Sequence, residues 1–466
     1  MEMLTFVLET DSRQPLYQQL YTHIKKEIQE GNIKPGTKLP SKRKLSTYLN
    51  LSQNTVQAAY IQLIEEGYIS SVERKGFYVS DIIPIKTNTR DKKPTILKKS
   101  TKDRSILYDF SIHGVDFSSF PFSTWRKLMR EVINEYDKEL LIPCDSFGYY
   151  RLRHALASYL YHSRGVICNE NQIIISSGTE YLFQILFQLF KDDTIYGIEN
   201  PGYEKLNQMF NANRAKFTTI DIDKDGMPLS QVYKSGANIL CITPAHQFPT
   251  GEIMPIKRRM QLLDWAKEQK NRYIVEDDYD SEFKYSGKPI PALQGLDHNE
   301  KVIYMGSFSK SLSPTIRVSY MVLPQHLLNI YKEDLSYILC PVPMMDQKIL
   351  CRFIEEGYFE RHLNKMRSIY RKKRELLIKS IRQLDCDIEI LGADAGLHLL
   401  IKVNNNMSES QLIEEAYKAG VKVYGISKYY TKPLLDKSPP LIILGYATLT
   451  DNEIIKAVKL LHNAWF

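Results

Sequence analysis

Apolar positions in the first part of the chain follow the spacing of short helices. Apolar side chains recur every four residues from Leu16 to Ile28, which places one apolar stripe along a first helix that Gly31 ends. Ser41 and Ser52 each precede a further apolar-periodic run, and we expect them to cap a second and a third helix. The run YISSVERKGFYVS then predicts a β-hairpin. Residues 1–80 are therefore expected to form a small α+β domain.

From residue 108 onward, strand-like apolar runs alternate with amphipathic helices. The strand-like runs are QIIISS, IYGIE, NILCIT, RYIVED and KVIYMGS. Strands separated by helices predict a mainly parallel sheet that is covered on both faces. We expect an α/β domain over residues 108–466, with a large part at about 108–345 and a smaller α+β part at about 346–466. The expected strands of the smaller part are LHLLIKV, VKVYGIS and LIILGYA.

Residues 81–107 lack apolar periodicity and predict a linker between the two domains. The net charge of the chain is +8, and this segment alone holds eight Lys/Arg against three Asp/Glu. Such a basic segment is attracted to phosphate polyanions, but the same composition also describes an ordinary solvated, flexible linker. Composition does not decide between these two interpretations.

The overall composition describes an ordinary globular protein. The chain has 466 residues, of which 43% are hydrophobic and 25% charged, and it contains no apolar run long enough to span a membrane. Its N-terminus lacks the pattern of a signal peptide, so we expect a cytoplasmic protein. The six cysteines are scattered without CxxC pairs or zinc-like spacing, which favours reduced, mostly buried thiols and no structural metal.

The third expected helix presents amide and hydroxyl side chains near its start. Val56, Ala59 and Leu63 would point inward, so the early polar residues face outward. A helix that follows another after a short turn and presents such groups fits the recognition helix of a DNA-binding protein. Periodicity alone also allows a small helical domain with polar surfaces. The DNA contacts expected from this helix are Gln53, Asn54, Thr55 and Gln57, beside its cap Ser52.

Lys310 lies in the run GSFSKSLSPTIRVS, beside groups that suit a phosphate. Ser307, Ser309 and Arg317 offer hydroxyl groups and a guanidinium for charge-assisted hydrogen bonds. Lys310 would then be a Schiff-base lysine, because a buried lysine beside another cation has a lowered pKa. Taken alone, a lysine near serines is usually a surface residue. A second phosphate contact is expected where a strand meets a helix, at Ser177, Gly178 and Thr179.

Acidic residues end the strand-like run YIVED and complete a site for pyridoxal phosphate. Asp277 suits the protonated ring nitrogen of the cofactor, and Tyr279 suits the ring oxygen O3′. An acidic strand end could equally be a helix cap or a metal site. However, Asp277 and Lys310 would lie at the carboxyl edge of one parallel sheet, where ligands bind. We therefore expect pyridoxal phosphate as the cofactor and no metal.

Two resemblances extend these expectations. Residues PLYQQLYTHIKKEIQEGNIKPGTKLPSKRKLSTYLNLSQNTVQAAYIQLIEEGYI resemble the GntR-type winged helix-turn-helix, which implies double-stranded DNA as a partner. The resemblance also implies DNA contacts at Arg43 and at Lys75 and Gly76 in the tip of the hairpin. The second resemblance, to the fold-type I aminotransferases, is carried by FGYYRLRHALASYL, SSGTE, ENPGYE, TPAHQFPTGEIMP, VEDDYDSEF and GSFSKSLSPTIR. Together they resemble the MocR subgroup of GntR regulators over essentially the whole chain. The resemblance implies Tyr203 beside the cofactor and a head-to-tail homodimer.

Two departures from the aminotransferase pattern bear on function. Phe248 stands where an asparagine near O3′ is usual, and Ile443 stands where an arginine usually holds the substrate carboxylate. Isoleucine cannot form a bidentate ion pair, so efficient transamination is not expected. His246 could take the place of the asparagine, or it could be structural. Lys205 could supply the missing cation for an effector, or it could be an ordinary surface lysine.

These features predict a transcriptional regulator that senses a small amine or amino acid through its cofactor. Two alternatives stay open on the sequence. The protein could sense pyridoxal phosphate itself and control vitamin B6 synthesis, or it could be an active aminotransferase with an appended DNA-binding module.

Overall fold

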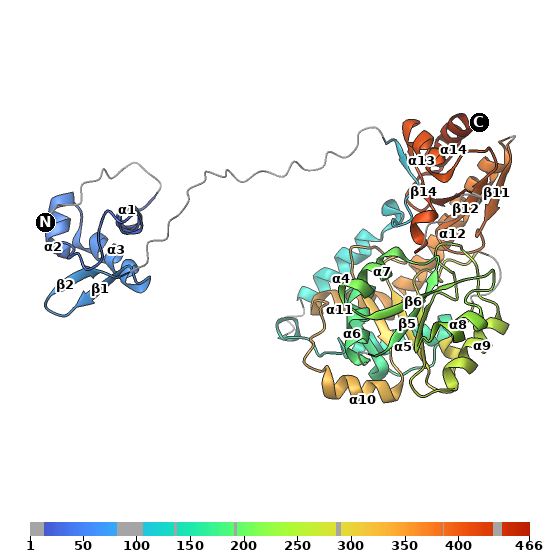
Figure 1. Ribbon diagram of the computed structural model, residues 1–466, viewed down its shortest axis with the longest axis horizontal. Helices are drawn as coiled ribbons and strands as arrows, with labels where there is room; N and C mark the ends of the chain where they lie inside the picture. The colour runs from blue at the N-terminus through green and yellow to red at the C-terminus, as the bar shows by residue number, and fades with distance from the viewer. Residues whose placement is uncertain are drawn as a thin grey trace. The chain divides into compact units, whose positions relative to one another are not determined.

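The computed structural model describes residues 14–81, 106–134, 138–190, 193–285, 290–384, 386–431 and 440–466. The chain forms two compact units, Met1–Ser100 and Thr101–Phe466, which are described separately (Figure 1). Most of the linker expected over residues 81–107 lies outside the described residues. In these described ranges, no helix is long and apolar enough to cross a membrane.

The first unit contains the three helices and the hairpin that the sequence predicts. They are α1 (Leu16–Gln29), α2 (Lys42–Leu49), α3 (Gln53–Glu65), β1 (Ile69–Val72) and β2 (Gly76–Val79). Oγ of Ser41 accepts a hydrogen bond from the backbone N–H of Lys44 at 3.3 Å. Oγ of Ser52 accepts one from Thr55 N–H at 3.1 Å, so both predicted caps are confirmed. The core of this unit includes Leu20, Ile24, Leu45, Val56 and Leu63.

A seven-stranded sheet forms the centre of the second unit. Its strands are β4 (Ile173–Ser176), β5 (Ile195–Asn200), β6 (Lys216–Asp221), β7 (Ile239–Ile242), β8 (Tyr273–Asp278), β9 (Val302–Ser307) and β10 (Ser319–Val322). Their order is β4-β10-β9-β8-β7-β5-β6, and only β10 runs antiparallel to its neighbours. The predicted mainly parallel sheet is confirmed. Strands β6 and β10 were not predicted from the sequence.

Helices cover both faces of this sheet, because neighbouring strand residues point to opposite sides. Val275 packs into the layer formed with α6 (Thr179–Leu189), α7 (Glu204–Ala212) and α10 (Gln325–Asp334). Ile274 packs on the opposite side. The helices of that side are α4 (Phe122–Asn134), α5 (Tyr150–Arg164), α8 (Leu229–Ser235), α9 (Ile256–Lys267) and α11 (Met344–Glu355). Short 3-10 turns lie at Phe117–Ser119, Lys138–Leu141, Glu170–Gln172, Gln294–Leu296 and Ser427–Tyr429.

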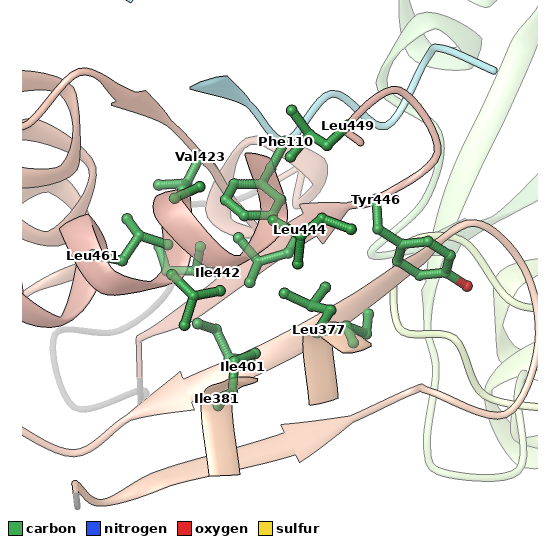
Figure 2. Packing of buried hydrophobic residues seen from close by; sticks show 14 of the residues in the cluster. Phe110, Leu377, Ile381, Ile401, Val423, Ile442, Leu444, Tyr446, Leu449 and Leu461 are labelled. Carbon is green, nitrogen blue, oxygen red and sulfur yellow. The ribbon is translucent and has the colours of Figure 1, made fainter. Parts of the chain in front are cut away.

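The small part has a four-stranded antiparallel sheet in the order β11-β12-β15-β14. The strands are β11 (Ile388–Leu391), β12 (His398–Val403), β14 (Tyr424–Gly425) and β15 (Leu441–Gly445). They pack with α12 (Tyr358–Arg382), α13 (Glu409–Lys418) and α14 (Asp451–Trp465). Phe110 lies in this core beside Leu444 and other buried side chains (Figure 2).

The division between the large and small parts differs from the one expected at residue 345. At the start of the second unit, β3 (Tyr108–Asp109) pairs in parallel with β13 (Val421–Lys422), so this segment belongs to the small part. In contrast, α11 packs against α4 and α5 in the large part. The core changes within α12, where Leu363 packs into the large part and Leu377 into the small part. Chain order alone therefore does not separate the two parts.

Candidate functional site

A cavity of about 270 Å³ lies where β8 and β9 end at the carboxyl edge of the large sheet. It also receives residues from the small part, among them His398 at the start of β12. Nine of the predicted site residues line it: Thr179, Tyr203, Lys205, Asp277, Tyr279, Ser307, Ser309, Lys310 and Arg317. Segments far apart in the sequence thus meet in one place. Ser177, Gly178 and His246 are not among its lining residues.

Lys310 follows β9 and is partly buried in this cavity. Its Nζ donates a hydrogen bond to the backbone carbonyl of Ile112. Burial lowers the pKa of Lys310 to about 8, and the nearby Asp280 carboxylate opposes this shift. A minority of this amine is therefore neutral, and nucleophilic, near physiological pH, whereas a lysine with the ordinary pKa of 10.5 is almost fully protonated there.

Cationic and hydroxyl groups gather at one end of the cavity, as expected for a phosphate site. Gly178 has a φ of +88°, and a Cβ atom at this position would collide with Nη2 of Arg317. Only glycine lets the guanidinium approach the start of α6 this closely. Oγ of Ser307 donates a hydrogen bond to Oγ of Ser309 at 2.8 Å. These groups and Thr179 form a cradle whose chemistry suits a phosphate.

Glu180 also lies in this cradle and was missed from the sequence. Its Oε2 accepts a hydrogen bond from Arg317 Nη2 at 2.8 Å, and both side chains are roughly half exposed. Burial tends to raise the pKa of Glu180, but its backbone hydrogen bond and Arg317 outweigh this effect and hold the pKa below its usual value. The signal was its position directly after Thr179 in the SSGTE run. A bound phosphate would have to share or displace this partner of Arg317.

Asp277 lies next to the last residue of β8 and lines the cavity, and its carboxyl group has a raised pKa. Burial raises its pKa to about 7, and the negative charges of Asp278, Asp280 and Glu180 act in the same direction. Its neighbour Asp278 points away into a buried network, where it accepts hydrogen bonds from Arg164 at 2.8 Å and Tyr304 at 2.6 Å. Of the two adjacent aspartates, Asp277 is therefore the one available to a ligand in the cavity.

The hydroxyl group of Tyr279 contacts a buried histidine, which in turn contacts a buried aspartate. Nδ1 of His246 lies 2.9 Å from the hydroxyl oxygen of Tyr279 and 2.9 Å from Oδ2 of Asp280. His246 and Asp280 are both almost completely buried. His246 thus contacts a cavity residue instead of lining the cavity itself. Asp280 was missed, although it directly follows Tyr279 in the quoted run VEDDYDSEF.

His113 lines the cavity and lies near three lysine side chains, those of Lys205, Lys310 and Lys428. Burial lowers the pKa of His113 to about 4, and the positive charges of Lys310, Lys205 and Lys428 act in the same direction. His113 and Lys205 both line the cavity. Ile443, in contrast, is fully buried in β15 and packs with Ile112 and Leu400. No sequence motif pointed to His113, because it comes from a distant segment of the chain.

The first unit presents the predicted DNA-contacting residues at its surface. Gln53, Asn54 and Gln57 on α3 are exposed, and Oε1 of Gln57 accepts a hydrogen bond from Lys42 Nζ at 3.2 Å. This bond places the start of α2 beside the first turns of α3. Arg43 lines a shallow hollow together with Lys44 and Tyr48. Lys44 and Tyr48 were not predicted from the sequence as DNA contacts. Ser52 and Thr55 are engaged in the helix cap, Lys75 is exposed, and Gly76 has a φ of +111°.

Comparisons with known proteins match both units. Residues 16–79 match the gntR family of bacterial regulatory proteins, and residues 115–461 match the class I and II aminotransferases. The chain is 41% identical over 454 residues to the uncharacterized HTH-type transcriptional regulator YdeL of Bacillus subtilis (strain 168), covering 97% of each chain. It is 32% identical to the probable rhizopine catabolism regulatory protein MocR of Rhizobium meliloti, covering 98% of this chain and 95% of that protein.

A solved structure shows the same fold for the second unit. Kynurenine aminotransferase of Pyrococcus horikoshii superposes with a TM-score of 0.69 at 23% identity, over 78% of this chain and 91% of the other. The match supports the aminotransferase fold that the strand order describes.

Proposed function

This chain belongs to the MocR-type regulators of the GntR family, and from that membership we propose that its aminotransferase-like domain binds pyridoxal phosphate at Lys310 and senses a small primary amine. The protein is a helix-turn-helix transcriptional regulator, and double-stranded DNA is the partner that its first unit implies. The observation that carries the proposal is the joint placement of Lys310, Asp277 and Arg317 around one cavity.

The residues of the cavity fit each part of the cofactor. Pyridoxal phosphate supplies an aldehyde that reacts reversibly with primary amines, attached to a ring that withdraws electrons. Lys310 would hold the aldehyde, and Arg317, Ser307, Ser309, Gly178 and Thr179 would hold the phosphate. Asp277 would face the ring nitrogen, where its raised pKa favours sharing a proton with that nitrogen. Tyr279 would face the ring oxygen, and Tyr203 would lie beside the ring.

The cavity also favours an amine that carries an acidic group. Lys205 and His113 line it, and Lys428 lies close enough to act on the pKa of His113. The two lysines offer positive charge for an anionic substituent, in place of the arginine that Ile443 replaces, while His113 is neutral near physiological pH and offers hydrogen bonding only. An effector that competes with Lys310 for the cofactor would release the lysine amine beside the carbonyl of Ile112. The effector would then change which groups Lys310 contacts.

The test is a spectral titration of the purified full-length protein with amines and amino acids, read together with operator binding at fixed salt. We expect amines to change the cofactor absorbance and the DNA affinity together. Lys310→Ala should lose the cofactor absorbance, and retained absorbance near the level of the unsubstituted protein would refute the Schiff-base role. Lys205→Ala should keep the absorbance but respond more weakly to amines with an acidic group.

Two other outcomes of the same titration would replace the proposal. A change in DNA affinity on adding pyridoxal phosphate alone, with no further effect of amines, would identify a sensor of the cofactor itself. Conversion of the bound cofactor to its pyridoxamine form with common amino acids would identify an aminotransferase. Buried Ile443, which cannot hold a substrate carboxylate, argues against the second outcome.

We also propose that the second unit forms a homodimer. One face of α4 exposes Phe122, Met129 and Ile133, whose exposed fractions are 63%, 37% and 50%. Their spacing along the helix puts them on one side, and such an apolar stripe is typical of a protein interface. Sedimentation equilibrium should give twice the mass of one chain, and Ile133→Lys should weaken the association.

A further inference from the structure

Two cysteines that are far apart in the sequence meet beside one glutamine. Cys144 lies between the 3-10 turn Lys138–Leu141 and α5, and Cys340 lies between α10 and α11. Nε2 of Gln347 lies 3.4 Å from Sγ of Cys144 and 3.5 Å from Sγ of Cys340. Both sulfur atoms thus contact the same amide nitrogen, and the Cys340 thiol donates to the carbonyl oxygen of Ile175. The two sulfur atoms are therefore neighbours.

Gln347 is held firmly, which fixes where the two sulfurs meet. It is fully buried, and its Nε2 also donates to the backbone carbonyl of Val342 at 2.8 Å. Its Oε1 accepts a hydrogen bond from the backbone N–H of Tyr149 at 2.7 Å. Both cysteines, in contrast, lie in segments without helix or strand structure. Such segments can adjust to the sulfur–sulfur geometry that a disulfide requires.

The pair differs chemically from other cysteines of the chain. Interaction with Cys340 lowers the pKa of Cys144 to about 7, while burial opposes this shift and Gln347 supports it; the same interaction raises the pKa of Cys340. A substantial fraction of Cys144 is therefore thiolate, the reactive form, near neutral pH. Burial raises the pKa of Cys168 and Cys351 to about 12 and keeps these thiols protonated. Cys340 is only partly buried and its neighbour Leu339 is 57% exposed, so the pair lies just beneath the surface.

We propose that Cys144 and Cys340 form a reversible intramolecular disulfide when the protein meets a peroxide. The Cys144 thiolate attacks one oxygen of hydrogen peroxide, and the O–O bond breaks to leave a sulfenic acid and, after protonation, water. The Cys340 thiol then attacks the sulfenic sulfur, the S–S bond forms, and a second water leaves. Two thiols lose two electrons in total, and one peroxide is reduced to two waters. The disulfide does not depend on the ligand proposed for Lys310.

The position of the pair links it to the strand that leads to the phosphate cradle. Sγ of Cys340 lies 3.4 Å from the carbonyl oxygen of Ile175 in β4. The N–H of Ile175 donates to the carbonyl of Phe147, three residues after Cys144, at 2.9 Å. β4 ends at Ser176, directly before Ser177 and Gly178. A disulfide would remove the thiol hydrogen of Cys340 and join the two loops beside β4.

The experiment treats the reduced full-length protein with a small excess of hydrogen peroxide. We expect each chain to lose two titratable thiols, and digestion without reductant to yield a peptide that joins Cys144 to Cys340. A thiol reductant should restore both thiols. Cys144→Ser and Cys340→Ser should each abolish the linked peptide, and Cys168→Ser should retain it. Circular dichroism checks that each variant is folded.

A second measurement uses the unsubstituted protein and therefore does not depend on whether the serine variants fold. In the unsubstituted protein, alkylation of Cys144 by iodoacetamide at neutral pH should be at least about tenfold faster than that of Cys168. Equal alkylation rates would overturn the proposal. So would a disulfide between two chains, oxidation of Cys144 only to the sulfinic acid, or no loss of thiols.

Discussion

His246 and Asp280 form a hydrogen-bonded pair at 2.9 Å, with both side chains only 1% exposed. The same imidazole nitrogen faces the hydroxyl group of Tyr279, also at 2.9 Å. One buried pair therefore positions a tyrosine that lines the cavity. The Asp280 side chain is almost completely buried, and His246 is the partner that the structure gives its carboxylate oxygens.

Replacing His246 by leucine should destabilise the second unit by about 3 kcal/mol, because it leaves the buried Asp280 carboxylate without this partner. All three tryptophans lie in that unit, so their fluorescence follows its unfolding in denaturant. The matched control is His326→Leu, since His326 and Glu300 are 45% and 56% exposed. That change should have an effect below about 0.5 kcal/mol. An equal effect of the two substitutions would contradict the assigned role of His246.

The pKa of Lys310 predicts how the cofactor-free protein takes up pyridoxal phosphate as the pH changes. Only the neutral amine reacts, and burial lowers its pKa from 10.5 to about 8. The uptake rate should therefore rise with pH by about tenfold per unit below pH 8 and level off above it. Stopped-flow absorbance measures this rate, with Lys310→Ala as the unreactive control. A rate that stays constant from about pH 6 to about pH 9 would contradict the prediction.

The lowered pKa of Lys310 also predicts how the free energy of unfolding changes with pH. Between pH 8 and 10.5 the unfolded chain binds more protons at this lysine than the folded chain does. The stability of the cofactor-free protein should therefore gain from Lys310 as the pH rises through this window. Comparing the pH dependence of unfolding with that of Lys310→Met isolates the contribution.

Gly178→Ala should weaken cofactor binding by at least about tenfold, because the new methyl group would collide with Arg317 and move its guanidinium. Gly236→Ala is the matched control. Gly236 also has a positive φ, +67°, but no atom lies within 4 Å of the position that its Cβ would take. Equilibrium dialysis of pyridoxal phosphate against the two variants separates the steric effect from backbone strain. Equal affinities would show that the position of Arg317 is not what binds the phosphate.

Substitutions in the first unit should separate base contacts from phosphate contacts. Asn54→Ala should weaken binding to an operator by about 1–3 kcal/mol in a sequence-dependent way. Arg43→Ala should weaken binding to all sequences and reduce the slope of log affinity against log salt by about 1. Lys26→Ala on α1, with a side chain 66% exposed, is the control. Fluorescence anisotropy at several salt concentrations distinguishes the three variants.

The parts of the fold that the sequence predicted are those whose local pattern agrees with their tertiary environment. The buried strand β7 is a continuous apolar run and β8 begins with one, and Ser41 and Ser52 cap helices as their positions indicate. β6 lies at the edge of the sheet and its run KFTTID has few apolar residues. β10 runs antiparallel to its neighbours and follows β9 without an intervening helix, so the alternation of strands and helices did not mark it.

The candidate site divides in the same way. Lys310, Asp277 and Arg317 could be predicted because each lies in a run with distinctive neighbours. His113 and His398 enter the cavity from segments that pack with the small part, and local sequence carries no sign of that contact. His246 does not line the cavity as an effector-binding residue would. Its Nδ1 instead contacts the Asp280 carboxylate and the Tyr279 hydroxyl group.

The hydrogen bond from Lys310 to Ile112 connects the cavity with the first described residues of the second unit. Leu107, at the start of the second unit, donates its N–H to the carbonyl of Gly420 at 2.8 Å, and Phe110 is anchored in the core of the small part. Five residues after Leu107, the carbonyl of Ile112 receives the amine of Lys310. Residues 107–112 thus connect the small part, through Leu107 and Phe110, with the reactive lysine, through the carbonyl of Ile112. In chain order they follow the DNA-binding unit. Any reaction that consumes the Lys310 amine removes its hydrogen bond to Ile112 and frees this stretch of backbone from the cavity.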